Sequence, residues 1–186
     1  MAVVIPPHPA MSTNIELTSS SVDQKPVLGG PRQRVARLGD FWSYTVDLRP
    51  MHAWQSGPLI VRLLQGLSER VLCPVMVSGI DLTGQTDVTA VRGAGKSLVV
   101  DGSTAGKSEG QFFSLVKDGV RYLHMVASVA ENSITFTPAL KVAITGGEIL
   151  EFAEPKIEGF LSGNSQGWTT GMVGNVGMTF RIEEAS

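Results

Sequence analysis

The sequence predicts an all-β fold, mainly an antiparallel barrel or sandwich, with one amphipathic helix. Three observations lead to this prediction. Glycine accounts for 21 of 186 residues, more than the usual ~7%, and charged residues make up only 17% against a typical ~25%. Roughly ten short apolar segments follow one another at the 8- to 12-residue spacing of small strands, with glycine-rich turns between them. A single segment has the periodicity of a helix.

The chain divides by composition into an arm and a domain. Residues 1–34 are rich in Pro, Ser, Thr and Gly and have no sustained apolar period, which is typical of an extended N-terminal arm. Residues 35–186 are expected to form a single β-rich domain, because a chain of this length buries about 70% of the surface that it exposes when unfolded.

The first elements of the domain follow from two periodicities. A half-buried strand is expected where apolar residues alternate with polar ones, at Trp42, Tyr44, Val46 and Leu48. The helix is expected at about 57–71, with Leu59, Leu63 and Leu67 on one face. Ser56 or Gly57 would cap it, and Pro58 would lie in its first turn.

After Pro74 the sequence predicts strands separated by turns. The expected strands are PVMVSGI, DVTAV, SLVVDG, QFFSLVK, VRYLHMVA, SITFT, LKVAI, EILEF, KIEGFL and VGMTFRI. Asp118-Gly119 and Gly146-Gly147 are suited to two-residue hairpin loops because glycine accepts positive φ. In the last strand Val176, Met178, Phe180 and Ile182 form one apolar face.

Charge and cysteine content argue against several classes of protein. The formal net charge is −2 and the pI is about 5.9, so a site that grips nucleic acid through a basic surface is not expected. A single cysteine, Cys73, excludes an internal disulfide and cysteine-based zinc modules. The first residues lack a signal-peptide pattern and no stretch is long enough for a membrane span, so synthesis in the cytoplasm without a membrane partner is expected.

Two short motifs resemble catalytic sequences without the required context. AVRGAGKS (90–97) resembles a phosphate-binding P-loop, but Ala90 replaces the first glycine and a β run follows where a helix is required, so it is predicted to be an inter-strand loop. GNSQG (163–167) matches a nucleophile elbow, yet no Asp or His follows Ser165. Asp101 and His124 could serve in another chain order, but nothing in their spacing favours this.

The remaining polar candidates do not converge in the sequence. His8, His52 and His124 lack a second ligand nearby, and His124 is expected to be a hydrogen-bonded packing residue. The carboxylate pairs Glu148/Glu151, Glu154/Glu158 and Glu183/Glu184 are expected to be solvated. No catalytic residue, cofactor site or metal site is therefore predicted, and no enzymatic activity is expected.

The aromatic residues fall into two groups. Trp42, Tyr44 and Trp54 are expected in the core. Trp168 lies in a loop rich in Gly, Ser, Asn and Thr, where it either anchors the loop or contacts a partner.

The order of several segments between residues 35 and 184 resembles that of bacteriophage distal tail or minor tail proteins of long non-contractile tails. The segments are GDFWSYTVDLRPM, a Trp before an amphipathic helix, GAGKSLVVDG, EGQFFSLV, VRYLHMV, LKV, GGEILEF and EPKIEGFL. The resemblance implies a structural virion protein that forms a ring, typically six-fold. Such a ring joins the tail tube to the tail-tip hub and surrounds the channel of the tape-measure protein, through which DNA passes only in transit.

Some features depart from that family, and others agree with a ring. The arm before Val35 is longer than expected, and GAGKS has a lysine where a polar residue is expected. The length leaves no room for a carbohydrate-binding insertion, so direct receptor recognition is not expected. Low charge and a mean hydropathy of +0.13 suit a surface covered by other subunits. The alternatives are a ligand- or carbohydrate-binding β-barrel module with Trp168 in its site, and a P-loop enzyme that depends on Lys96.

Overall fold

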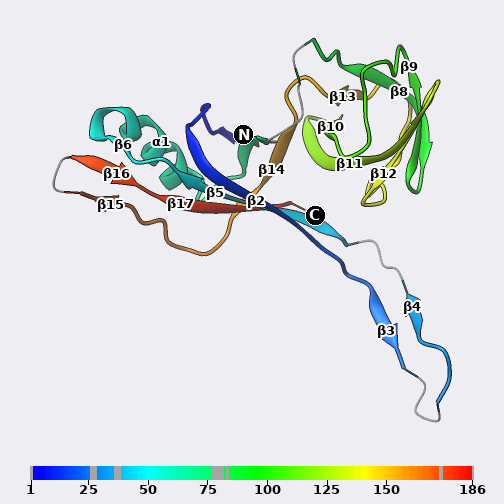
Figure 1. Cartoon of the computed structure of the whole chain (residues 1–186), viewed down its shortest axis with the longest axis horizontal. Helices are drawn as coiled ribbons and strands as arrows, with labels where there is room; N and C mark the ends of the chain where they lie inside the picture. The colour runs from blue at the N-terminus through cyan, green and yellow to red at the C-terminus, as the bar shows by residue number, and fades with distance from the viewer. Residues whose placement is uncertain are drawn as a thin grey trace.

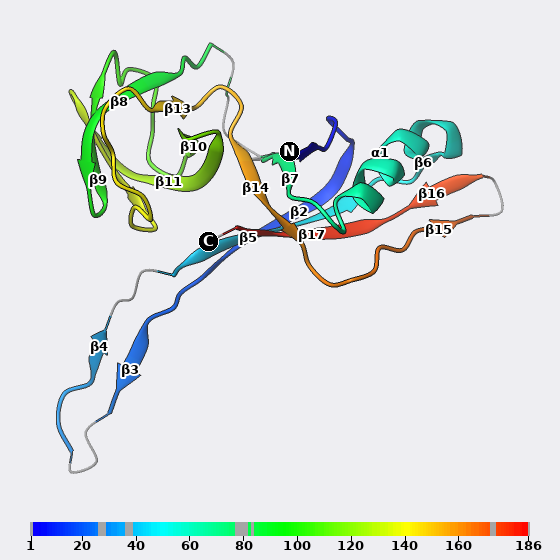
Figure 2. The same ribbon diagram turned by 180° about the vertical axis from the view of Figure 1, so that it is seen from behind.

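The computed structural model describes residues 2–25, 29–35, 39–76, 82, 84–171 and 174–185. The described chain is mainly β and has one helix, which confirms the predicted fold class. It forms a six-stranded sheet covered by the helix, a closed barrel beside the sheet, and a narrow hairpin that projects away from both (Figure 1). Figure 2 shows the same arrangement from behind, with the barrel and the helix at opposite ends of the sheet.

The six-stranded sheet is assembled from distant parts of the sequence. In spatial order its strands are β1 (Val3–Val4), β7 (Val71–Pro74), β14 (Lys156–Leu161), β17 (Thr179–Glu184), β5 (Phe41–Leu48) and β2 (Ala10–Thr18). All neighbours are antiparallel except β1 and β7. The alternation predicted for β5 and β17 is confirmed, because their apolar residues point into one buried core.

Helix α1 (Ala53–Gln65) packs on this core through Leu59 and Leu63. It starts four residues before the predicted start, with His52 as the N-cap, so Pro58 lies inside the helix and not in its first turn. It also ends earlier than expected: Leu67 lies beyond the helix and is 37% exposed, and Val71 begins β7. Proline at position 58 leaves the carbonyl of Trp54 without a helical donor, which is tolerated where that turn faces water.

A small sheet extends the helix end of the molecule. Its strands are β15 (Thr169–Thr170), β16 (Asn175–Gly177) and β6 (Met51–His52). β16 pairs with β6 directly before α1, and Val176 adds to the sheet core.

The barrel lies between β7 and β14 in the sequence. Its strands are β8 (Val88–Ala94), β9 (Ser97–Asp101), β10 (Phe112–Lys117), β11 (Val120–Ala130), β12 (Ser133–Thr137) and β13 (Ile149–Glu151). All six strand pairs are antiparallel, and β13 closes the barrel by pairing with both β10 and β8. Phe113, Phe136 and Phe152 pack against one another in its interior, so the barrel has a core of its own.

The two predicted glycine turns have different outcomes. Asp118-Gly119 joins β10 to β11 with positive φ at both residues, as expected. The Gly146-Gly147 hairpin is wrong, because LKVAI forms no strand and β13 pairs elsewhere. Gly147 instead donates its N–H to the carbonyl of Ala90. Of the predicted PVMVSGI strand, Val75 and Met76 lie outside any strand and 77–80 fall outside the described residues.

Residues 1–34, expected as one extended arm, divide into two parts. β1 and β2 lie in the six-stranded sheet, and Ile5 between them is buried in its core. The hairpin formed by β2 and β5 then continues away from the body as β3 (Val22–Gln24) and β4 (Gln33–Val35). The described residues 19–25, 29–35 and 39–40 make up the projecting part, and we call the segment 19–40 the arm (Figures 1 and 2).

Candidate functional surfaces

The arm is a two-stranded ribbon with both faces in solvent. Every residue of β3 and β4 is exposed. Arg34 donates two hydrogen bonds to the Asp23 carboxylate, at 2.7 and 3.2 Å, and these lower the pKa of Asp23. Val22 and Val35 pair across the ribbon and are both partly exposed. An isolated ribbon of this kind is marginally stable in water.

The six-stranded sheet has one apolar and one polar face. Residues on β2, β5 and β17 that alternate with the core residues share the polar face: Ser12, Asn14, Glu16, Ser43, Thr45, Asp47, Thr179, Arg181 and Glu183. Arg181 lies between Glu16 and Glu183, at 3.6 and 3.5 Å, and Thr179 donates to Asp47 at 2.9 Å. The face is therefore hydroxyl-rich and acidic, with three carboxylates and one guanidinium.

A buried carboxylate joins the barrel to the sheet. Glu184, at the end of β17, accepts the backbone N–H of Trp42 in the sheet at 3.3 Å and that of Leu123 in the barrel at 2.8 Å. Lys141 forms an ion pair with it at 2.9 Å. Because the Glu184 side chain bonds groups of both the sheet and the barrel, it fixes the position of the barrel relative to the sheet.

Two further contacts strengthen the same junction. Glu158 is buried and accepts the backbone N–H of Arg121 at 3.0 Å. The Ser114 hydroxyl donates to the carbonyl of Lys156 at 2.7 Å and accepts its N–H at 2.6 Å. The expectation that Glu158 and Glu184 are solvated is therefore wrong. Strand alternation could have indicated this for Glu184, since it continues the apolar series that ends at Ile182.

Glu148 is a third buried carboxylate that was expected to be solvated. Burial raises its pKa, but hydrogen bonds from Lys117 at 2.6 Å and from the backbone and hydroxyl of Thr145 outweigh that effect and lower it to about 2. Glu151, its neighbour in the sequence, pairs with Arg121 at 2.8 and 2.9 Å. Each carboxylate thus has its own cation: Glu148 holds the 145–146 turn on the barrel, and Glu151 links β13 to β11 within it.

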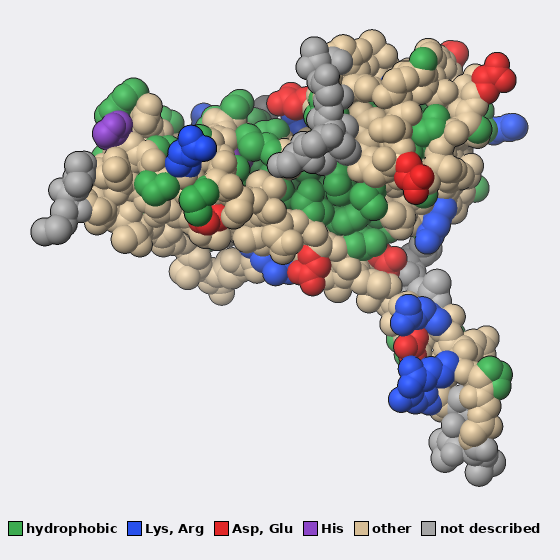
Figure 3. All heavy atoms as spheres, viewed as in Figure 1, with side chains coloured by type: hydrophobic (Ala, Val, Ile, Leu, Met, Phe, Trp, Pro, Cys, Tyr) green, Lys and Arg blue, Asp and Glu red, His purple; other side chains and the backbone are tan. Residues whose placement is uncertain are grey.

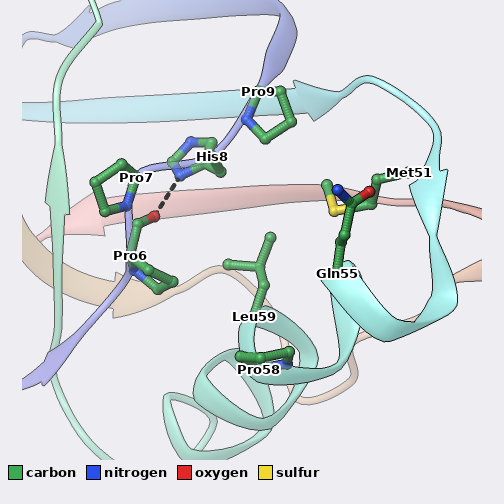
Figure 4. A pocket seen from close by; sticks show the side chains of 8 residues that line it. All are labelled: Pro6, Pro7, His8, Pro9, Met51, Gln55, Pro58 and Leu59. Atoms are coloured by element: carbon green, nitrogen blue, oxygen red, sulfur yellow. Dashed lines mark hydrogen bonds between the residues drawn. The ribbon is translucent and has the colours of Figure 1, made fainter.

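An apolar groove of about 310 Å³ lies between the N-terminal segment and α1. In Figure 4 Pro6, Pro7 and Pro9 face Pro58 and Leu59 of the helix, with His8 between Pro7 and Pro9 and with Met51 and Gln55 at one side. His8 bonds the Pro6 carbonyl through Nδ1 at 3.0 Å and packs edge-on against Phe180. Burial lowers the pKa of His8, so the groove is uncharged at neutral pH.

A second groove, of about 560 Å³, contains Trp168. Its other lining residues include Met11, Asp47 and Thr179, which lie at the end of the polar sheet face. Trp168 is 45% exposed, so its side chain is partly buried against the protein. This partial burial agrees with an anchoring role in the loop, and a contact with a partner stays a prediction.

The outer face of α1 is apolar and exposed. Trp42 and Tyr44 are buried as expected, but Trp54 is 76% exposed and the expectation that it lies in the core is wrong. The earlier helix start turns Trp54 to the side opposite Leu59, where Val61 and Leu64 are also exposed. Exposed large side chains at this spacing are typical of a contact surface.

The two catalytic-looking motifs form ordinary connections. AVRGAGKS lies within the β8–β9 hairpin, with positive φ at Gly95, as the sequence predicted. GNSQG lies in the loop between β14 and β15. Ser165 lies in the loop after β14, a strand of the six-stranded sheet, whereas His124 lies in the barrel. Neither motif leads into a helix.

The three histidines are far apart in the fold. His8 lies under the sheet, His52 caps α1, and His124 is buried in the barrel. His124 bonds the carbonyl of Pro138 through Nδ1 at 3.1 Å and packs on Phe113 and Phe136, which confirms its expected packing role. Among the described residues there is no group of three or more His, Cys, Asp or Glu side chains suited to a metal ion.

The helix α1 is too short and too polar to cross a lipid bilayer, and no other described segment forms a helix that could. No model of a known protein family matches the sequence. No curated protein matches it either.

Proposed function

We propose that this protein is a structural subunit of a phage tail tip. In this proposal several copies form a ring, with the six-fold symmetry that is typical of the family it resembles. The ring joins the tail tube to the tail-tip hub around the channel for the tape-measure protein and DNA. The protein acts mechanically, without catalysis or a cofactor.

The arm is the observation that carries the proposal. All residues of β3 and β4 are exposed, and the ribbon extends beyond the reach of its own sheet and barrel (Figure 1). Only a neighbouring molecule can bury such a segment, which is what a subunit of a ring or a stack of rings requires.

The ends of the sheet and the outer face of α1 support the same proposal. The six-stranded sheet stops at β1 on one side and at β2 on the other, so each copy offers two different edges. Exposed edges pair readily with other chains. Contacts between different surfaces generate closed rings when the rotation between copies closes, and Trp54 and Val61 provide apolar area for such contacts.

The polar sheet face is our candidate for the channel wall. Its three carboxylates, on Glu16, Asp47 and Glu183, outnumber the one guanidinium, on Arg181. A mildly acidic wall repels the DNA phosphates, so DNA slides past without binding. In particles that carry Glu16→Lys and Asp47→Lys, genome release should be slower, and unchanged release kinetics would remove this face from the channel.

Mass measurement tests the ring directly. The untagged protein should form a defined oligomer in light scattering at several concentrations, with closed rings in negative-stain images. A matched variant replaces residues 21–37 by a two-residue turn, which removes the outer arm but retains β2 and β5. It should keep its thermal transition and lose or weaken assembly. A wild-type chain that stays monomeric both alone and with the tail-tube and hub proteins would contradict the proposal.

The second candidate function is binding of a small ligand or carbohydrate. It is favoured by the half-exposed indole of Trp168 beside the carboxylate of Asp47 in the second groove, since aromatic faces and carboxylates are common in sugar sites. It predicts a monomer that binds a glycan saturably and loses this binding on Trp168→Ala. Screening against a glycan array with this variant distinguishes it from the ring.

A further inference from the structure

We infer that the arm binds an acidic surface of a second copy of this chain, through the basic residues near its tip. This rests on the proposed function and names the chemistry of the contact. In the sequence, residues 19–40 contain four cations (Lys25, Arg32, Arg34 and Arg37) and two acids (Asp23 and Asp40), which gives the arm a formal charge of +2. Since the chain as a whole has −2, the remainder carries −4.

This charge is segregated in space as well as in sequence. In Figure 3 Lys and Arg side chains crowd the projecting arm, whereas the acidic side chains of that view lie mostly over the sheet and the barrel. Glu69, Asp101, Glu109 and Glu131 are exposed and have no ion pair within the described part of the chain. A copy of this chain therefore offers unpaired carboxylates to the arm of another copy.

The charged and apolar residues of the arm favour contact with a protein surface. Arg34 is held by Asp23 and maintains the ribbon, whereas Lys25 and Arg32 are exposed and form no ion pair among the described residues. Val22 and Val35 form an apolar pair on the ribbon, which a protein surface can bury. A nucleic acid fits less well, because an arm with a formal charge of only +2 releases few counterions and the remainder of the chain, with −4, repels phosphate.

Zero-length carbodiimide crosslinking tests the contact at atomic reach. The reagent condenses the amine of Lys25 with a carboxylate in direct contact, forms an amide and is itself converted to a urea by taking up the oxygen that the condensation releases. In a mixture of ¹⁴N- and ¹⁵N-labelled full-length protein, mass spectrometry should find mixed-isotope crosslinks between Lys25 and Asp or Glu residues of the body. Lys25→Arg keeps the charge and should abolish these crosslinks while self-association persists.

Charge reversal tests the energetics. Lys25→Glu combined with Arg32→Glu should weaken self-association by about tenfold, as expected when two exposed ion pairs become repulsions. The control reverses Arg92 and Lys96, exposed on the β8–β9 hairpin, and changes the net charge equally. The control should associate like the wild type. Association of the wild type should also weaken as the salt concentration rises from about 50 to about 500 mM, because the electrostatic screening length shortens severalfold over this range.

Three outcomes would overturn the inference: equal association of the arm variant and the control, no effect of salt, or crosslinks of Lys25 only within one copy. Loss of duplex DNA binding in the arm variant with unchanged self-association would assign the arm to nucleic acid instead. The proposed function fails separately. If the arm variant still forms rings, the arm contact is refuted and the proposed ring stands. If the wild type forms only dimers that depend on the arm and never closes into a ring, the ring is refuted and the arm contact stands.

Discussion

The barrel and the six-stranded sheet differ in whether all of their strands are paired on both sides. The barrel uses one continuous segment, 88–151, and every strand in it has two neighbours. The sheet combines both ends of the chain with its middle and ends at β1 and β2. Each strand of the barrel is thus paired on both sides, whereas the sheet, its helix and its arm present strand edges and exposed apolar side chains.

The largest expected effect comes from the barrel core. Phe113 is fully buried and stacks on Phe152 with ring centroids 4.9 Å apart. Phe113→Ala should cost about 4 kcal/mol of unfolding free energy, because it removes the ring and leaves a cavity. Denaturant unfolding measures this. Phe160→Ala, a half-exposed residue of the sheet, should change little, and a similar loss in both variants would contradict a separate barrel core.

A close backbone contact in the sheet should come next. A Cβ at Gly159 would overlap the carbonyl oxygen of Glu183 on the neighbouring strand. Gly159→Ala should therefore destabilise the protein by about 3 kcal/mol, because backbone atoms must move. Gly167→Ala is the control, since a Cβ there meets no atom within 4 Å. Calorimetry should show a lower Tm in the first variant only.

The junction can be weakened without disturbing either core. Glu184→Gln leaves Lys141 without its anion and weakens the acceptor for two backbone N–H groups, at a cost of about 2 kcal/mol. Unfolding should then separate into two transitions, one for each body. Glu183→Gln removes an equal charge from a half-exposed neighbour and should leave one transition. A single unchanged transition in the Glu184 variant would show that the apolar contact alone couples the bodies.

Acid should weaken the barrel through His124. Burial lowers the pKa of His124 to about 3, against 6.5 for an unperturbed histidine. The unfolded chain therefore binds a proton that the folded barrel refuses, so stability falls as the pH drops from about 6.5 toward 3. His124→Phe should flatten the pH dependence in this window. His52→Gln, at the exposed helix cap, should keep the wild-type slope, and part of the slope should remain in both because the pKa of His8 is also lowered.

The smallest effect is expected at the free edge of β2. The N–H of Leu48 points to β17 and that of Arg49 to Pro9, so alternation directs Asn14 toward β5 and Thr13 outward. Thr13→Pro should cost less than about 1 kcal/mol, because proline is tolerated where the N–H faces solvent. Asn14→Pro should cost about 1 kcal/mol more through a lost ladder bond. Equal losses would show that β2 pairs on its other side as well.

The local sequence is sufficient to predict the structure of a segment wherever the conformation depends on neighbouring residues alone. The alternation of Trp42 to Leu48 defined β5, and the Asp118-Gly119 pair defined a hairpin, because both depend on neighbouring residues alone. The GAGKS segment was recognised as an inter-strand turn for the same reason: a β run follows it. These features fixed the fold class of the molecule.

The tertiary structure decided what covers each face and which groups meet. Glu184 is buried only because Leu123 and Lys141 of the barrel approach it, and Trp54 is exposed because the core is already filled from the other side of α1. The extent of the arm also depends on the tertiary structure, because β1 and β2 lie in the sheet and so do not belong to the projecting segment. Periodicity shows which face of a segment is apolar, whereas the partner of that face depends on contacts between residues far apart in the chain.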